Sequence, residues 1–292
     1  MSRFGDTLSL VKFSHSVFAL PFALMGAWLA AEGPPPLRTL GWIVVCAVAA
    51  RTAAMAFNRV VDRDIDARNP RTSGRELPSG RLGVGYARAL VLVGSAVFIA
   101  GAFALNGLAG RLSPLVLVVL LGYSYVKRFS SGAHFVLGLA LGLAPLGAWI
   151  AVRGNFEGDL VPVLLLFVAV WTWVAGFDLI YACQDASFDA AHGLLSVPAR
   201  IGVAGALRLS RALHVVTVLA LVGVALRADL GAVFWASCVV VAALLAWEQS
   251  LVSADDLSRV DVAFFTINGW VGVLLFVGLA VDMAVLGGPG AA

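Results

Sequence analysis

The stretch LGWIVVCAVAARTAAMAFNRVVDRDIDARNP, residues 40–70, joins an apolar run to a dense group of charged residues. Residues 40–60 are long enough to cross a bilayer as a helix, which takes about 20 residues. The ten residues that follow contain two arginines and three aspartates. The stretch therefore predicts a membrane-spanning helix that ends in charged residues at one membrane surface.

The rest of the chain is equally apolar. Of its 292 residues, 61% are hydrophobic and 13% are charged, and the mean hydropathy is +0.95. Water-soluble globular domains do not have this composition. We therefore expect an all-α, polytopic membrane protein that forms a single domain over residues 1–292.

A window of about 20 residues identifies nine candidate membrane-spanning helices. They cover residues 10–31, 40–60, 86–109, 112–126, 133–152, 160–182, 206–226, 230–248 and 262–284. Ser113 and Pro114 are expected to open the fourth span as N-cap and first-turn residue, and Pro162 to open the sixth. The first apolar run is long and has no small-residue cleavage site, which favours a membrane helix over a signal peptide.

Basic residues indicate how these helices are oriented. Of the 20 lysines and arginines, Arg51 lies within a span and four lie on the side opposite the N-terminus, which leaves fifteen on the N-terminal side. The four are Arg38, Arg111, Arg153 and Arg227. The positive-inside rule then places the N-terminus and the even-numbered helix ends in the cytoplasm, in a prokaryotic cytoplasmic membrane. The net charge of +3 reflects this topology and does not indicate nucleic-acid binding.

Three polar residues recur at four-residue spacing where the second span ends. Asn58, Asp62 and Asp66 share one helical face over about 12 Å if the helix continues. Like charges at this spacing destabilise a helix unless something positive lies nearby. The stretch alone could be a solvated helix end whose aspartates pair with neighbouring arginines. Those arginines are Arg59, Arg63 and Arg68.

A second carboxylate pair occurs in DLIYACQDASFDAAHG, residues 178–193, where the sixth span ends. Asp185 and Asp189 again stand four residues apart, and both spans end on the same membrane face. Mg²⁺ takes oxygen ligands and is usually held by one or two carboxylates plus substrate phosphates. Two facing clusters are therefore suited to metal ions that clamp a diphosphate and neutralise its charge as it leaves.

The chain resembles the intramembrane aromatic prenyltransferases of the UbiA superfamily. These enzymes carry an NxxxDxxxD motif and a DxxxD motif, which correspond to Asn58-Asp62-Asp66 and Asp185-Asp189. The resemblance extends over nearly the whole chain and includes NPRTSGRELPSG (69–80), YSYVKR (123–128), YACQD (181–185) and SVPARIG (196–202).

This resemblance implies a helical bundle around a central cavity that opens to the lipid. Two Mg²⁺ ions, held by the two motifs, would bind the diphosphate of a polyprenyl donor and promote its ionisation to an allylic cation. An electron-rich phenolic ring would attack this cation and then lose a ring proton. The partners are thus the bilayer, a polyprenyl diphosphate and a small aromatic acceptor.

Further basic and polar residues are candidates for substrate binding. Lys127 and Arg128 end the fourth span on the cytoplasmic face, so they can reach the diphosphate or simply anchor the helix. Tyr123 lies one turn before Lys127, and the YxxxK pattern of the family corresponds to this pair. Arg63 is the remaining candidate on the helix of the first motif.

Arg51 and Asp178 are the charged residues deepest in the membrane. An ionisable residue at this depth is a functional-site hypothesis by default. Each lies seven residues before its motif, so both are expected to face the cavity. They either pair with each other or leave Arg51 to bind an anionic group of the acceptor.

The segment around 67–85 is too polar for the membrane and is expected to cap the cavity from the cytoplasm. Arg71 and Arg75 either approach the diphosphate or belong to a solvated basic loop. Closure over the substrate would exclude water. The tail 285–292 is expected to be disordered.

Lys12 bears on the identity of the acceptor. Relatives that act on 4-hydroxybenzoate carry an arginine near this place, and a lysine cannot grip a carboxylate in two places. Lys12 could also simply extend to the membrane surface. The leading acceptor is 4-hydroxybenzoate, which leads to ubiquinone, and the alternative is a dihydroxynaphthoate of menaquinone biosynthesis. A transporter is the alternative from another class, although its polar residues should gather at the midplane.

Overall fold

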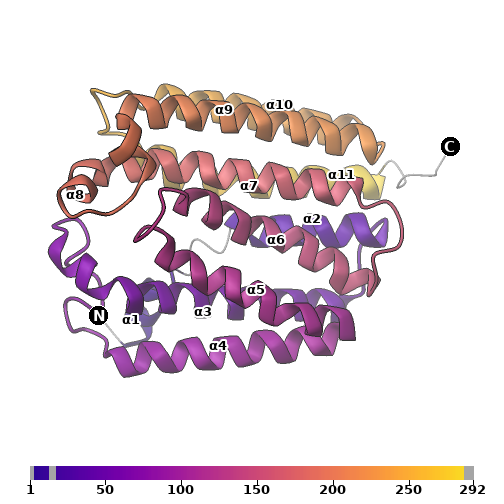
Figure 1. The fold of residues 1–292 in the computed structure, drawn as a ribbon. Coiled ribbons are helices and arrows are strands. Elements are labelled where there is room, and N and C mark those ends of the chain that lie inside the picture. Colours follow the sequence, from indigo (N-terminus) through magenta and orange to yellow (C-terminus); the bar gives the residue numbers. More distant parts are fainter. Residues whose placement is uncertain (1–2, 13–17, 286–292) are drawn as a thin grey trace.

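The structure, a computed structural model, describes residues 3–12 and 18–285. Within these ranges it contains helices and turns but no strand, which confirms the predicted all-α class. The long helices lie side by side in one bundle (Figure 1). The predicted tail lies outside the described residues, except for Val285 at the end of the last helix.

The helices follow one another with short connections. Their bounds are α1 Arg3–Leu10, α2 Leu20–Ala31, α3 Leu37–Arg68, α4 Val84–Leu105, α5 Gly107–Val126, α6 Ala133–Arg153, α7 Val161–Ala182, α8 Ala186–Ala191, α9 Val197–Arg227, α10 Ala232–Ser250 and α11 Asn268–Val285. A 3₁₀ turn, η2 Cys183–Asp185, joins α7 to α8, and a π-helical segment, η3 Val262–Ile267, leads into α11.

Eight helical segments of the described chain are long and apolar enough to cross a membrane. They correspond to the second to ninth predicted spans, and α2 is a shorter apolar helix of 12 residues. Helix α3 continues without a break through the first carboxylate motif. The chain is therefore a multi-pass membrane protein, and the count is close to the predicted nine.

The first predicted span, 10–31, is wrong at its N-terminal end. Helix α1 already ends at Leu10, and Lys12 lies in a turn with a positive φ of 50°. The next described helix, α2, begins at Leu20. Hydropathy detected the apolar run but could not detect this interruption.

The predicted start of the fourth span is also wrong. Asn106 is the N-cap of α5, because its side chain accepts a hydrogen bond from the Ala109 amide at 2.8 Å. Pro114 therefore lies inside the helix, and Ser113 donates to the Gly110 carbonyl. A strong cap residue six positions earlier decided the boundary. Pro162 does open α7 as predicted.

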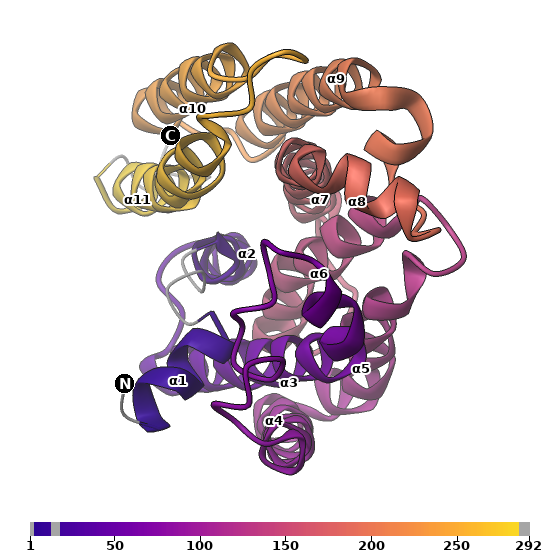
Figure 2. The ribbon, with the colours of Figure 1, turned by 90° about the vertical axis from the view of Figure 1, so that its left-hand side faces the viewer.

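Viewed along the bundle, the helices form two groups joined by α2, α6 and α7 (Figure 2). Helices α9, α10 and α11 lie on one side, and α1, α3 and α4 lie on the other. Helix α7 is the most buried of the candidate spans and packs against both α6 and α9.

Small residues allow α6 to approach its neighbours closely. A Cβ added to Gly26 of α2 would lie 2.2 Å from the Pro145 carbonyl oxygen, and one added to Gly138 of α6 would lie 2.4 Å from the Trp171 carbonyl oxygen. Side chains larger than hydrogen would push these helices apart. The close packing fixes α6 between α2 and α7.

Helices α3, α5 and α7 all end at one end of the bundle, which we call the carboxylate end. The loop of residues 69–83 covers this end between α3 and α4. Leu77 and Leu82 of the loop pack with Leu10 and Ala56. The loop is therefore a packed part of the fold, close to the predicted limits of 67–85.

Candidate active site

The first motif lies on one buried face of α3. Asp62 is 3% exposed and Asp66 is 4% exposed. The Asn58 side-chain amide donates a hydrogen bond to Asp62 Oδ2 at 3.0 Å. The helix continues past the apolar run because other elements supply the positive charge that these carboxylates need.

The end of α5 supplies the positive charge for Asp62. Lys127 Nζ lies 2.7 Å from Asp62 Oδ2, and Arg128 Nη2 lies 3.4 Å from Oδ1. Arg128 also donates to the carbonyls of Val61 and Ser124. Both basic residues therefore lie at the first motif, which favours the binding hypothesis over simple anchoring in the membrane.

The loop of residues 69–83 supplies the charge for Asp66. Arg75 Nη1 lies 2.8 Å from each oxygen of this carboxylate. Thr72 also donates a hydrogen bond to the Asp66 carbonyl at 3.0 Å. These contacts tie the loop to the end of α3 and place Arg75 in the candidate site, as predicted.

The same loop also reaches the second motif. Asp185 accepts hydrogen bonds from the Asn69 amide at 2.9 Å and from Arg71 Nε at 2.9 Å, and its other oxygen contacts Arg71 Nη2. Arg71 also donates to the Tyr181 hydroxyl at 2.8 Å. One loop thus connects the two motifs, as the topology of their spans predicted.

Asp189 completes the second motif from α8. It hydrogen-bonds with Ser196 and interacts electrostatically with Asp185, Lys127 and His134. Ser196 belongs to the SVPARIG segment and is the N-cap of α9. This segment therefore holds the second motif in position.

Additional positive charge surrounds the two motifs. Arg59 is buried, and none of the described residues hydrogen-bonds with its Nε. Burial, followed by repulsion from Arg59 and Arg75, lowers the pKa of Lys12. Although burial raises the pKa of Glu76, the hydrogen bond from Ser9 and the nearby arginines hold it below its usual value. The cations at this end are suited to a ligand with several negative charges.

Arg63 is the predicted site residue that the structure does not bring to the motifs. Its side chain is 47% exposed and pairs with the neighbouring Asp64 at 2.9 Å. One residue beyond Asp62, it is turned about 100° around the helix. Sequence proximity to the motif therefore did not place it on the motif's face.

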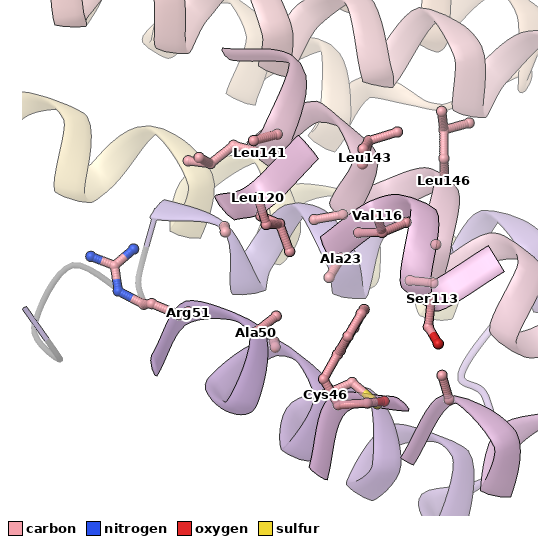
Figure 3. Close-up of a pocket in the computed structure, with 18 of the residues that line it drawn as sticks. Ala23, Cys46, Ala50, Arg51, Ser113, Val116, Leu120, Leu141, Leu143 and Leu146 are labelled. Atoms are coloured by element: carbon pink, nitrogen blue, oxygen red, sulfur yellow. The ribbon is translucent and has the colours of Figure 1, made fainter. Parts of the chain in front are cut away.

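An apolar cavity of about 370 Å³ extends from the carboxylate end between α2, α3, α4, α5 and α6. Figure 3 shows Arg51 at one end, with Val116, Leu120 and Leu141 along the walls. Tyr123 also lines the cavity and interacts electrostatically with Arg51 and Asp62. The cavity thus begins one helical turn inside the first motif.

Of the two alternatives for Arg51, the structure contradicts its pairing with Asp178. Arg51 donates through Nε and Nη2 to the Lys12 carbonyl, at 3.3 and 3.1 Å. Asp178 instead lies 2.7 Å from His134 Nδ1 at the start of α6. No carboxylate in residues 3–12 and 18–285 is found paired with Arg51, so its positive charge at the cavity wall is available to an anionic group of a ligand.

No three His, Cys, Asp or Glu side chains of the described ranges are gathered as a ready-made metal site. The donor set nevertheless fits Mg²⁺, because Asn58 and the four aspartates offer only oxygen ligands near one opening. Basic side chains hold three of these carboxylates, Asp62, Asp66 and Asp185. A metal ion and its phosphate ligand would have to displace these basic side chains from the carboxylates.

Sequence reasoning missed several residues of this site. Asn69 lies in the quoted NPRTSGRELPSG segment, but only the fold shows that it bonds to Asp185. Arg59 was considered only as a surface ion-pair partner, although it is 3% exposed. His134 carried no motif signal. Its only clue was its place as a titratable residue at the start of a membrane span.

Comparison with known proteins identifies the family. A model of the UbiA prenyltransferase family matches residues 19–272, which is most of the chain. The chain belongs to the UbiA prenyltransferase family. It is therefore an enzyme that transfers prenyl groups, and this membership rules against the transporter alternative.

Relatives of this UbiA family member cover nearly its full length. The 4-hydroxybenzoate octaprenyltransferase of Xanthomonas oryzae pv. oryzae is 34% identical over 284 residues, which are 96% of this chain and 93% of that protein. The 4-hydroxybenzoate octaprenyltransferase of Aeromonas hydrophila is 31% identical over 261 residues, or 89% of this chain and 88% of that protein.

Solved structures share its fold. The apo structure of a UbiA homolog from Aeropyrum pernix K1 is 38% identical, has a TM-score of 0.84, and covers 92% of this chain and 98% of its own. A UbiA homolog from Archaeoglobus fulgidus bound to DMAPP and Mg²⁺ is 19% identical and has a TM-score of 0.74. The match covers 96% of this chain and 99% of that chain. The bundle described above is thus the UbiA fold.

Proposed function

We propose that this UbiA family member transfers a polyprenyl group from a polyprenyl diphosphate to the ring of 4-hydroxybenzoate, in quinone biosynthesis. One observation carries the proposal. The buried carboxylates of Asp62 and Asp66 and the partly exposed carboxylate of Asp185, each held by a basic side chain, lie at the end of the bundle from which the apolar cavity with Arg51 extends. Such a site offers separate places for a diphosphate, a metal, an isoprenyl chain and a carboxylate.

The diphosphate of the donor would bind at the carboxylate end. Lys127 and Arg128 on one side, and Arg71 and Arg75 on the other, would move from the aspartates to the phosphate oxygens. Arginine binds phosphate oxygens through two parallel hydrogen bonds, whereas lysine acts as a point charge. These side chains would orient the donor and hold the leaving group after the C–O bond breaks.

Mg²⁺ would bind to oxygens of Asn58, Asp62 and Asp66 from α3, of Asp185 from the 3₁₀ turn η2 and of Asp189 from α8. We propose two ions that share the diphosphate. Homologues solved with Mg²⁺ and prenyl diphosphates support this use of a divalent metal. When bound, Mg²⁺ would neutralise the negative charge that grows on the departing diphosphate.

The isoprenyl chain would lie in the apolar cavity. Its walls are formed mainly by Leu, Val and Ala side chains such as Leu120, Leu141 and Ala144. An apolar chain gains about 25 cal/mol for each Å² that it removes from water. With the loop of residues 69–83 above it, the site would also keep water away from the allylic cation.

The acceptor would bind near Arg51, whose guanidinium can pair with a carboxylate. 4-Hydroxybenzoate carries this carboxylate opposite an activating hydroxyl group, and the named relatives support it as the acceptor. 1,4-Dihydroxy-6-naphthoate also carries a carboxylate and activating hydroxyl groups, on a larger ring system, and is the alternative, because Lys12 cannot grip a carboxylate in two places as an arginine would. The excess of basic residues supports a cytoplasmic carboxylate end in a prokaryotic inner membrane.

The test uses purified protein in detergent with Mg²⁺, a radiolabelled polyprenyl diphosphate and the two acceptors in parallel assays. We expect Mg²⁺-dependent formation of a prenylated hydroxybenzoate. A product from the naphthoate alone would assign the alternative acceptor. Release of diphosphate without either product would contradict both acceptors, and an intact donor would contradict the proposed transfer.

A further inference from the structure

A buried histidine and aspartate pair lies beside the candidate site and outside both motifs. His134 is the second residue of α6 and is 5% exposed. Its Nδ1 lies 2.7 Å from Asp178 Oδ2. Because a carboxylate can only accept at this distance, Nδ1 carries the proton.

The other ring nitrogen of His134 is left available. Nε2 is buried and has no hydrogen-bond partner among the residues that the structure describes. With the proton on Nδ1, Nε2 offers a lone pair, and a buried polar atom without a partner calls for an explanation. A histidine that is oriented by a carboxylate and has a free Nε2 is arranged as a general base.

His134 and Asp178 lie on helices that lead from the cavity and to the second motif, respectively. On α6, His134 lies three residues before Leu137 and seven before Leu141, and both leucines line the cavity. It therefore shares their helical face, one turn closer to the carboxylate end. Asp178 lies on α7, seven residues before Asp185, which stands in the 3₁₀ turn η2 that follows this helix.

We propose that His134 removes the ring proton of the prenylated acceptor, and that Asp178 positions His134 and stabilises its charged form. This inference rests on the proposed function. As the C–O bond of the donor breaks, its electron pair leaves with the diphosphate. A π-electron pair of the ring then forms the new C–C bond to the allylic carbon.

The proton then passes from the ring carbon to Nε2, and the C–H electron pair restores the aromatic ring. The imidazolium that forms lies against the Asp178 carboxylate. It loses its proton to water or to the released diphosphate when the products leave. No oxidant or further reactant is required.

The surroundings of His134 leave one other candidate to accept the ring proton. Asp178 faces His134 directly, and Asp189, which interacts electrostatically with His134, also interacts with Asp185 and Lys127. Asp189 already hydrogen-bonds with Ser196, Asp185 is held by Arg71, and Lys127 is cationic. The departing diphosphate is therefore the alternative acceptor of the proton.

The test measures prenylation by the wild type and by His134→Gln, Asp178→Asn and His192→Gln. The acceptor is used with hydrogen or with deuterium at the ring positions that are prenylated. His192 is an exposed histidine on α8 and serves as the matched control. Thermal stabilisation by Mg²⁺ with a non-ionising polyprenyl thiolodiphosphate reports folding and donor binding independently of turnover.

We expect His134→Gln to lower the rate about 100-fold or more, the usual contribution of a general base. A primary isotope effect that the wild type lacks should appear, because proton removal becomes rate-limiting. Asp178→Asn should change both readouts in the same direction, and His192→Gln should change neither. Stabilisation by the donor analogue should be retained.

Two results would overturn the inference. One is a wild-type rate in His134→Gln, and the other is a slower rate without an isotope effect, which would assign the proton to the diphosphate. If His134→Gln does not fold, Asp178→Asn decides by the same readouts. A wild type that prenylates neither acceptor would instead refute the proposed function.

Discussion

Two buried carboxylates of this protein have opposite kinds of partners. Asp62, at the carboxylate end, is 3% exposed and is held by Lys127 and Arg128. Glu248, in the middle of the other helix group, is 0% exposed and accepts a hydrogen bond from the Asn268 amide at 2.9 Å. The partners of Asp62 are charged and are 29% and 33% exposed, whereas Asn268 is neutral and fully buried.

Glu248 belongs to a network of polar contacts that joins α7, α9, α10 and α11. Asn268 accepts from Trp173 Nε1 at 2.6 Å while it donates to Glu248. Gln249 donates to Ser210 at 2.8 Å and to His214 Nδ1 at 3.0 Å. Such bonds fix helices against each other in lipid.

The difference between the two sites indicates which one can exchange its partners for a ligand. Half-exposed cations can leave a carboxylate and rehydrate, or they can bind a phosphate. Buried neutral partners have no such alternative, because breaking their bonds leaves unsatisfied groups in an apolar interior. Burial of a carboxylate therefore does not by itself mark a functional site. The kind of partner and its access to solvent distinguish a functional carboxylate from a structural one.

The largest effect is expected at the two motifs. Asp62→Ala and Asp185→Ala should each lower turnover on the order of a thousand-fold, since a metal clamp contributes several kcal/mol to the transition state. The melting temperature in detergent should change little, because the released cations can rehydrate. Radiometric turnover and a thermal melt check this prediction, and activity retained by both variants at saturating donor and Mg²⁺ would contradict the metal assignment.

The loop arginines should have an intermediate effect. Arg71→Gln and Arg75→Gln should each raise the KM for the donor about ten-fold, because a hydrogen bond between charged groups contributes about 1.5–3 kcal/mol. Arg68→Gln is the matched control, since Arg68 is an exposed arginine at the same helix end. Equal KM values in all three variants would indicate that the loop is only a solvated basic segment.

Lys12→Ala should act on the acceptor more than on the donor. We expect a KM change of a few-fold for the acceptor, the size of a single polar contact. The donor KM should stay near its wild-type value. Parallel assays with 4-hydroxybenzoate and the naphthoate measure the discrimination, and no change for either acceptor would leave Lys12 as a residue that only extends to the membrane surface.

The smallest effect on turnover is expected in the network around Glu248. Asn268→Ala should destabilise the protein by about 1–3 kcal/mol, because it leaves Trp173 and Glu248 without their hydrogen-bond partner. The activity of the protein that remains folded should be unchanged. Thermal inactivation and initial rates below the melting transition test this, and a loss of turnover without a loss of stability would give the network a catalytic role.

Hydropathy and charge predicted most of the fold, since eight predicted spans and the common face of both motifs follow from local composition. Interruptions of helices were not predictable in this way. The turn at Lys12 lies within an apolar run, and Asn106 overrides the later Ser113 and Pro114 because a cap forms where the first strong acceptor occurs.

The residue types of the candidate site were predictable, but their pairing was not. Periodicity places Arg51 and Asp178 on cavity-facing sides of their helices, yet it does not say what lies opposite. The partner of Asp178 is His134, which comes from a helix that carries no motif. Contacts of the loop, such as Arg71 with Asp185, join residues more than a hundred positions apart and require the tertiary fold.

The most direct measurement compares Asp62→Asn with Glu248→Gln, two isosteric changes of buried carboxylates. Mg²⁺-dependent formation of prenylated product from radiolabelled polyprenyl diphosphate is followed for both. In the described part of the chain Glu248 Oε2 accepts no hydrogen bond and lies 3.8 Å from His214 Nδ1, so the amide breaks no hydrogen bond there. We predict that Asp62→Asn loses nearly all turnover while Glu248→Gln retains it. Equal activity in the two variants would contradict the assignment of the carboxylate end as the site of prenyl transfer.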